Sequence, residues 1–173
     1  MNRSAISLII WSIVLILAQV LVFNHICLFG YAVAFVFIYT LIKLPISMSK
    51  EWQFTIAFLL GLVIDIFSDT LGMNTLACTI LMAVRRPVIR LYVTRDDELT
   101  DTYPGYNSFG TFSFIKYVLT LTLLYCGMFY LIESLFSVQS IKTLFQILAS
   151  TALTALLILG IDNLTFQKSE KRL

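Results

Sequence analysis

Long apolar segments alternate with short polar connections along the whole chain. A helix needs about 20 mainly apolar residues to cross the roughly 30 Å hydrocarbon layer of a membrane, and six segments approach or reach that length. With approximate ends, they cover residues 5–23, 30–46, 52–68, 73–93, 114–132 and 143–161. The pattern predicts an all-α fold, a polytopic membrane bundle of six transmembrane helices that forms one domain over residues 1–173.

Composition supports the membrane prediction and narrows the chemistry. Hydrophobic residues make up 59% of the 173 residues and charged residues only 13%, which is too apolar for a water-soluble domain of this size. The three cysteines, Cys27, Cys78 and Cys126, have no C-x-x-C spacing and no histidine nearby, so they indicate neither a metal site nor a disulfide framework. We expect no cofactor, no metal and no nucleic-acid partner.

The distribution of basic residues predicts the orientation. Lys and Arg gather in the cytoplasmic connections of membrane proteins. If the N-terminus is inside, eleven of the twelve Lys and Arg residues lie on the cytoplasmic side, and Lys142 alone lies opposite. We therefore expect an N-in, C-in topology. This topology places the polar stretch 95–113 in a cytoplasmic loop. The loop is either a solvated linker or a contact surface for a partner.

Two small residues and two acidic residues recur at helical spacing in the third segment. If residues 52–68 are helical, Ala57, Gly61, Asp65 and Asp69 lie on one i, i+4 row. Small residues let helices approach closely, so the row predicts a groove that leads into a pair of acids at the outer end of the helix. The groove is predicted to form or brace the surface that receives a partner.

The third and fourth segments are separated by a very short connection. Gly72 can end a helix without steric penalty, and Asn74 suits the N-cap of the following helix. We expect the two segments to form a tight helical hairpin in which both residues have structural roles.

A catalytic or metal role for Asp65 and Asp69 is considered and disfavoured. The sequence contains no recognisable nucleophile motif, no H-E-x-x-H and no phosphate loop, so we expect no catalytic residues and no enzyme. A divalent cation would need more oxygen ligands than Asn74 and local carbonyls supply. An intramembrane enzyme ranks third among the alternatives, and it would require His25 to converge with both aspartates.

Three arginines follow the apolar part of the fourth segment. Arg85, Arg86 and Arg90 are expected to emerge on the cytoplasmic side, where phospholipid head groups are their default partners. A docking surface for a cytoplasmic protein is the other interpretation.

The stretch between the third and fourth segments resembles the bacterial rod shape-determining protein MreD family. The similarity is carried by Gly61-x-x-x-Asp65, by Asp69 and by the run from Leu71 to Ala77, and it extends to the length, the six segments and the short tails. Many members carry His at the position of Asn74, so no role that needs an imidazole is transferred.

The resemblance implies a non-enzymatic membrane scaffold of the cell-elongation machinery, which makes peptidoglycan and maintains rod shape. It implies a multi-pass protein of the bacterial cytoplasmic membrane that binds MreC and links to MreB and to RodA with its penicillin-binding transpeptidase. The family also resembles in fold the substrate-binding subunits of ECF vitamin transporters. The alternative function is therefore a solute-binding subunit of a vitamin-type transporter, although Ala5 and Ala18 do not provide the Ala-x-x-x-Ala patch typical of such subunits.

Overall fold

The computed structural model describes residues 3–23, 33–92, 104–105, 109–134 and 140–170, and all regular elements within these ranges are helices. In chain order they are α1 (Arg3–Ala18), a π-helical continuation η1 (Gln19–Phe23), α2 (Ile38–Ile42), α3 (Lys50–Ser68), α4 (Met73–Tyr92), α6 (Thr111–Ser134) and α7 (Ser140–Glu170). The predicted all-α class is confirmed for this part of the chain.

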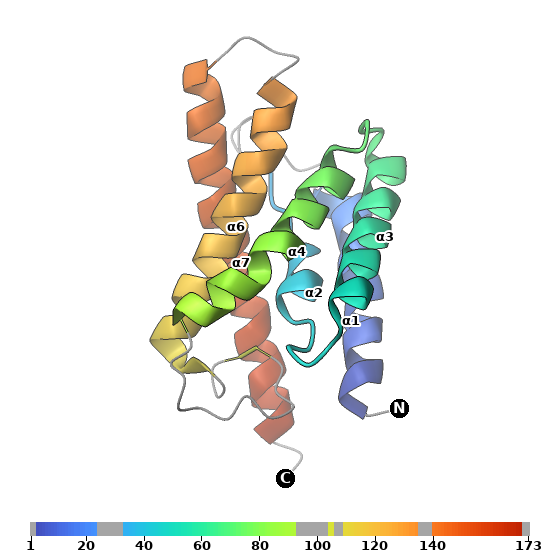
Figure 1. Cartoon of the computed structure of the whole chain (residues 1–173), viewed down its shortest axis with the longest axis vertical. Coiled ribbons are helices and arrows are strands. Elements are labelled where there is room, and N and C mark those ends of the chain that lie inside the picture. The colour runs from blue at the N-terminus through green and yellow to red at the C-terminus, as the bar shows by residue number, and fades with distance from the viewer. Residues whose placement is uncertain (1–2, 24–32, 93–103, 106–108, 135–139, 171–173) are drawn as a thin grey trace.

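The helices run alternately up and down one bundle. In Figure 1, α1, α3 and α6 run upward, α4 and α7 run downward, and the start of α1 lies at the same end as the end of α7. We call the end at which α3 begins the base and the end at which it finishes the turn end. Helix α4 packs against α3 on one side and α6 on the other, and α7 packs against α6. The predicted α3–α4 hairpin is present.

Three helices are long and apolar enough to cross a membrane: Lys50–Ser68, Thr111–Ser134 and Lys142–Asn163. A shorter apolar helix covers Ile10–Phe23. Helix α4 is also 20 residues long, but it carries Arg85, Arg86 and Arg90 and falls outside this group. These helices define a membrane protein, and six spans with both termini inside remain a prediction.

The second predicted helix, over residues 30–46, is wrong as a continuous helix. Residues 33–35 have no regular structure, a turn follows, and only Ile38–Ile42 are helical. The segment is apolar because it is buried inside the bundle, with Phe37, Ile38 and Leu41 fully enclosed. Irregular backbone at this depth is stable only where protein groups satisfy its N–H and C=O groups.

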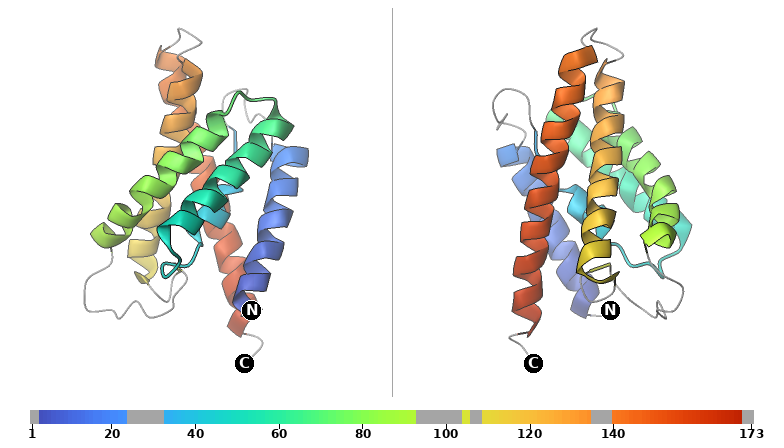
Figure 2. Two further views of the ribbon diagram at one scale, coloured as in Figure 1. Left: turned by 45° about the vertical axis from the view of Figure 1, so that its right-hand side comes forward. Right: turned by 90° about the vertical axis from the view of Figure 1, so that its left-hand side faces the viewer.

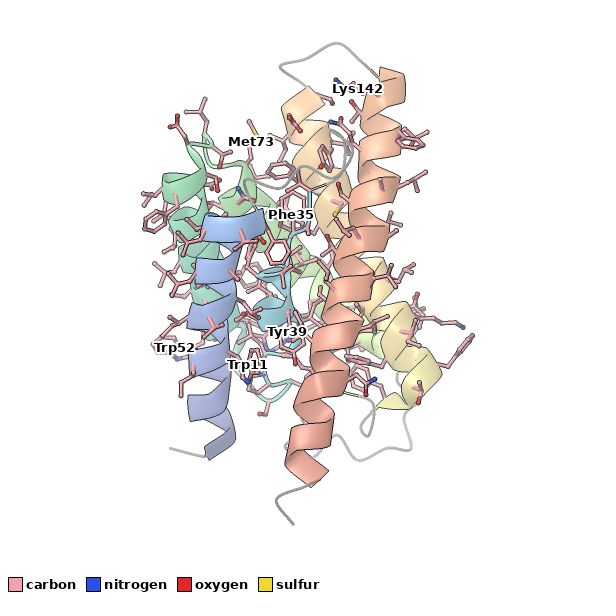
Figure 3. All side chains as sticks on the ribbon, turned by 180° about the vertical axis from the view of Figure 1, so that it is seen from behind. Trp11, Phe35, Tyr39, Trp52, Met73 and Lys142 are labelled. Carbon is pink, nitrogen blue, oxygen red and sulfur yellow. The ribbon has the colours of Figure 1, made fainter. Side chains whose placement is uncertain are left out.

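The outside of the bundle carries many large apolar side chains. They lie on α1, α3, α6 and α7 and include Ile13, Leu17, Phe58, Leu59, Ile66, Leu119, Leu123, Leu148 and Leu156, each at least 41% exposed. Inside, Phe35 of the irregular segment packs against aromatic rings of α6, with centroids 5.2 Å from Tyr125 and 4.9 Å from Phe129. Figure 3 shows Phe35 and Tyr39 between α1 and α7. An apolar exterior around a packed core suits a bundle surrounded by lipid.

Candidate functional site

Asp65 lies at the centre of the α3–α4 hairpin. Its carboxylate Oδ1 accepts hydrogen bonds from the Thr70 hydroxyl at 2.5 Å and from the backbone and side-chain nitrogens of Asn74 at 3.0 Å each. Its Oδ2 accepts the Thr75 backbone N–H at 2.8 Å and the Thr75 hydroxyl at 2.5 Å. Asp65 is only 5% exposed. Five donors therefore satisfy one buried carboxylate, which places a negative charge at the positive N-terminal end of α4.

Asn74 extends this network to a third helix. Its Oδ1 accepts the Tyr125 hydroxyl of α6 at 2.5 Å, while its Nδ2 donates to Asp65 and to Thr70. Asn74 and Tyr125 are both buried. The predicted N-cap role of Asn74 is wrong, because Asn74 lies inside α4 and the capping acceptor is Asp65 of the preceding helix. Asn74 instead joins α3, α4 and α6.

The small residues of α3 form a groove that is already filled. Ala57 and Gly61 are buried, and a Cβ atom on Gly61 would lie 2.4 Å from the Thr75 Cα atom of α4. Only glycine permits so close a backbone approach. At Gly61 the predicted groove therefore receives α4 of the same chain, and Gly61 has a structural role.

Asp69 does not join Asp65. It follows the last residue of α3 with a left-handed φ of 53°, donates its N–H to the Asp65 carbonyl, and is exposed. The continuous helical row predicted for the two acids is broken there, because the chain leaves the helix at Asp69. Gly72 has a φ of 78° and lies in the connection immediately before α4, but α3 already ends at Ser68, so Asp69 rather than Gly72 follows the last residue of that helix.

The irregular segment 33–36 is held by side chains from two sides. Gln19 of η1 donates to the Ala34 carbonyl and accepts the Val36 N–H, each at 2.9 Å. From α7, the Ser150 hydroxyl accepts the Val33 N–H and the Thr154 hydroxyl accepts the Phe35 N–H, each at 3.1 Å. Polar residues at positions 150 and 154, one helical turn apart in an apolar segment, were the sequence signal for this contact.

Arg85 is fully buried where α2 ends. Its guanidinium donates to the Tyr117 hydroxyl at 3.1 Å, to the Gln53 amide oxygen at 3.4 Å, to the Ile42 carbonyl at 3.3 Å and to the Leu44 carbonyl. A cation at the C-terminal end of a helix interacts favourably with its free carbonyls. Arg85 therefore fixes the end of α2 against α3, α4 and α6.

The prediction that Arg85 contacts lipid head groups is wrong, since its side chain has no exposed surface and all its donors point inward. Arg86 is half-buried and donates to the Met48 carbonyl at 2.9 Å, and only Arg90 of the three is exposed. The available signal was that position 85 falls within the predicted bounds 73–93, because charged residues inside a membrane span usually face the protein interior and have a defined role.

A second buried charge cluster joins α2 to α7. The Lys43 ammonium lies 2.6 Å from the Asp162 carboxylate, which also accepts the Tyr39 hydroxyl at 2.9 Å. The ammonium lies 5.0 Å from the ring centroid of Phe114 in α6. The sequence pattern gave no means of pairing residues 43 and 162, which lie in different predicted segments.

The acidic residues in the described part of the chain do not gather into a cluster. Within the part of the chain that the structure describes, no group of three or more His, Cys, Asp or Glu residues could hold a metal ion. Both carboxylate oxygens of Asp65 are occupied by protein donors. His25 and most of the loop 95–113 lie outside the described residues. The polar networks around Asp65, Arg85 and Lys43 connect neighbouring helices.

Comparisons of the chain with models of protein families, with characterised proteins and with solved structures give no match.

Proposed function

We propose that this protein is a non-enzymatic membrane scaffold of the bacterial cell-elongation machinery, as its resemblance to the MreD family implies. The proposed location is the bacterial cytoplasmic membrane. The proposed partners are MreC, bound within the membrane, and through it MreB and RodA with its penicillin-binding transpeptidase.

The observation that supports the proposal is the role of the residues that carry the resemblance. Gly61 admits α4, Asp65 caps α4, and Asn74 ties both helices to Tyr125. All three residues join α3 to α4 or α6, and both carboxylate oxygens of Asp65 accept protein donors rather than facing a substrate. A tightly packed hairpin with an apolar outer face suits a scaffold that positions another membrane protein.

The apolar outer face of α3 is the surface that we assign to the partner. Phe58, Leu62 and Ile66 are 49%, 39% and 69% exposed and recur every four residues, so they form one stripe opposite the face that contacts α4. Residues of this stripe can be changed without touching the Asp65 network. Partner binding and folding can therefore be tested separately.

The test combines deletion of the gene in the source organism with co-purification. Deletion is expected to convert rods into round cells, and the wild-type chain is expected to restore the rods and to co-purify with MreC. A triple Phe58→Ala, Leu62→Ala, Ile66→Ala variant should lose MreC while remaining monodisperse. The matched control changes Leu119 and Leu123, on the exposed face of α6, to Ala.

Unchanged cell shape after deletion, together with no recovery of MreC by the wild-type chain, would refute the proposal. Loss of MreC in the α6 control but not in the α3 variant would move the interface to the other face. Retention of a vitamin-like solute through purification would instead support the alternative transporter subunit.

A further inference from the structure

The α3–α4 hairpin ends at a lower level than α6 and α7 at the turn end. Figures 1 and 2 show this step from three directions. The Tyr125 hydroxyl marks the level of the start of α4, because it donates to Asn74. Helix α6 continues for nine residues beyond Tyr125, to Ser134, which corresponds to about 13 Å at 1.5 Å per residue.

Helix α7 accompanies α6 over this extra length. The hydroxyls of Tyr130 and Ser150 lie 2.8 Å apart, so these residues face each other across the two helices. Helix α7 begins ten residues before Ser150. Both helices therefore extend beyond the hairpin by more than two turns.

The hairpin turn has the mixed character of a membrane–water boundary. The carboxylate of Asp69 is exposed there, beside Phe67 and Leu71, which are 64% and 89% exposed. A carboxylate facing hydrocarbon is strongly unfavourable, whereas apolar side chains next to it favour lipid. The boundary of the membrane on this side of the molecule therefore lies at the turn.

On the other side of the molecule the boundary lies higher. Four exposed apolar residues lie beyond the level of Tyr125: Leu131 of α6 and Leu144, Phe145 and Leu148 of α7, which are between 55% and 65% exposed. Leu131 follows Tyr125 in α6, and the other three precede Ser150, which faces Tyr130. A cluster of large apolar side chains in water is unfavourable. The exposed charged residues nearest this tip are Glu133 and Lys142, so they set the boundary here.

We propose that the bilayer is thinned beside the α3–α4 hairpin, so that its surface dips from the tips of α6 and α7 down to the turn at Gly72. With the bundle axis along the membrane normal, one flat surface would place either Asp69 in hydrocarbon or the apolar tips of α6 and α7 in water. Local thinning has a modest free-energy cost for each ångström of mismatch. It keeps the Asp69 carboxylate in water and the apolar tips of α6 and α7 in hydrocarbon. When no partner is bound, the thinned lipid contacts the exposed face of α3 and of its turn, the same face that we assign to the partner. The proposal requires a membrane but no protein partner.

The test measures the depth of nitroxide labels in vesicles of phosphatidylcholine and phosphatidylglycerol. Labels are attached to Leu71→Cys and Phe145→Cys, with a second pair at Ile66→Cys and Leu144→Cys; all four positions are at least 62% exposed. Cys27 is changed to Ser, whereas Cys78 and Cys126 are fully buried and need no replacement. Labels at Leu62 and Leu119 provide the reference for mid-depth positions on α3 and α6.

Collision of each nitroxide with oxygen and with a water-soluble nickel complex reports its depth in the local bilayer. In a thinned bilayer the labels at 71 and 145 should lie at the same depth near the head groups, to within about one helical turn, roughly 5 Å. A difference on the order of 13 Å between them would overturn the proposal. If the label at 71 lies deep in the hydrocarbon, the bilayer is flat and covers the turn. If the label at 145 lies in water, the bilayer is flat and the tips of α6 and α7 extend out of the membrane. Because no partner is present, the scaffold function can fail or hold independently of this result.

Discussion

The carboxylate of Asp65, in the last turn of α3, accepts the backbone N–H of Thr75, in the first turn of α4, at 2.8 Å. The first N–H groups of a helix have no partner within it, and a residue directly before the helix usually supplies one. Here a residue of the preceding helix does so, which is possible because Gly61 lets the two backbones nearly touch. The capping of α4 by Asp65 and the close approach of α3 to α4 at Gly61 therefore depend on each other.

Asp65→Asn should destabilise the protein, whereas Asp69→Asn should not. The first change removes the charge that five donors stabilise, and we expect a loss of about 2 kcal/mol or more in the free energy of unfolding. Asp69 is exposed, and Asn tolerates the same left-handed φ, so a change within about 0.5 kcal/mol is expected. Unfolding in mild detergent titrated with dodecyl sulfate measures both. Equal losses would show that the network is not a stabilising unit.

Gly61→Ala and Gly127→Ala form a matched pair. A Cβ at position 61 would meet the backbone of α4, whereas a Cβ at position 127 meets nothing within 4 Å. We expect Gly61→Ala to lose about 1–3 kcal/mol by overpacking and Gly127→Ala to gain up to about 1 kcal/mol from helix propensity. The midpoint of thermal unfolding in detergent distinguishes them. A neutral Gly61→Ala would contradict the close contact of α3 with α4.

Arg85→Met should be destabilising and Arg90→Met nearly neutral. Removing the buried guanidinium leaves the Leu44 carbonyl and the Gln53 amide oxygen without this donor, at about 1–3 kcal/mol for each buried group left unsatisfied. Arg90 is exposed, and we expect a change within about 0.5 kcal/mol. Arg85→Lys should not restore stability, because an ammonium cannot reproduce the planar fork of donors. Full stability of Arg85→Lys would show that the charge alone matters.

Lys43 and Asp162 should be energetically coupled. In a double-mutant cycle with Lys43→Met and Asp162→Asn, the loss in the double variant should be smaller than the summed losses of the single variants by about 2 kcal/mol. The reason is that each single change leaves a buried charge without its partner. Thr55→Ala, on the exposed side of α3, is the control: its change in the free energy of unfolding should simply add to that of Lys43→Met or of Asp162→Asn. A coupling near zero would mean that solvent, rather than the partner, stabilises each charge.

Local pattern was sufficient for the elements whose stability comes from their own apolar length. The predicted segments 52–68, 73–93, 114–132 and 143–161 correspond to α3, α4, α6 and α7, and the glycine at position 72 correctly marked the hairpin turn. The first segment, 5–23, is likewise helical as α1 and η1. Such helices satisfy their backbone hydrogen bonds internally, so a run of apolar residues is enough to specify them.

The segment over residues 30–46 shows where this reasoning fails. Its apolar character reflects burial within the bundle, and burial favours a helix or an irregular segment equally. Gln19, Ser150 and Thr154 satisfy the backbone of residues 33–36 from the two sides. Two of these residues lie more than 100 positions away in the chain, and no local pattern contains that information.

What the sequence determined by itself is an apolar, all-helical chain with an acid-bearing, glycine-marked hairpin, since periodicity and length act within each segment. The tertiary structure alone decided what the polar residues do. It separated Asp65 from Asp69 by ending α3 between them, enclosed Arg85 at the end of α2, and paired Lys43 with Asp162. A charged group in an apolar interior is stable only with a partner in reach, and packing of distant segments determines which partner that is.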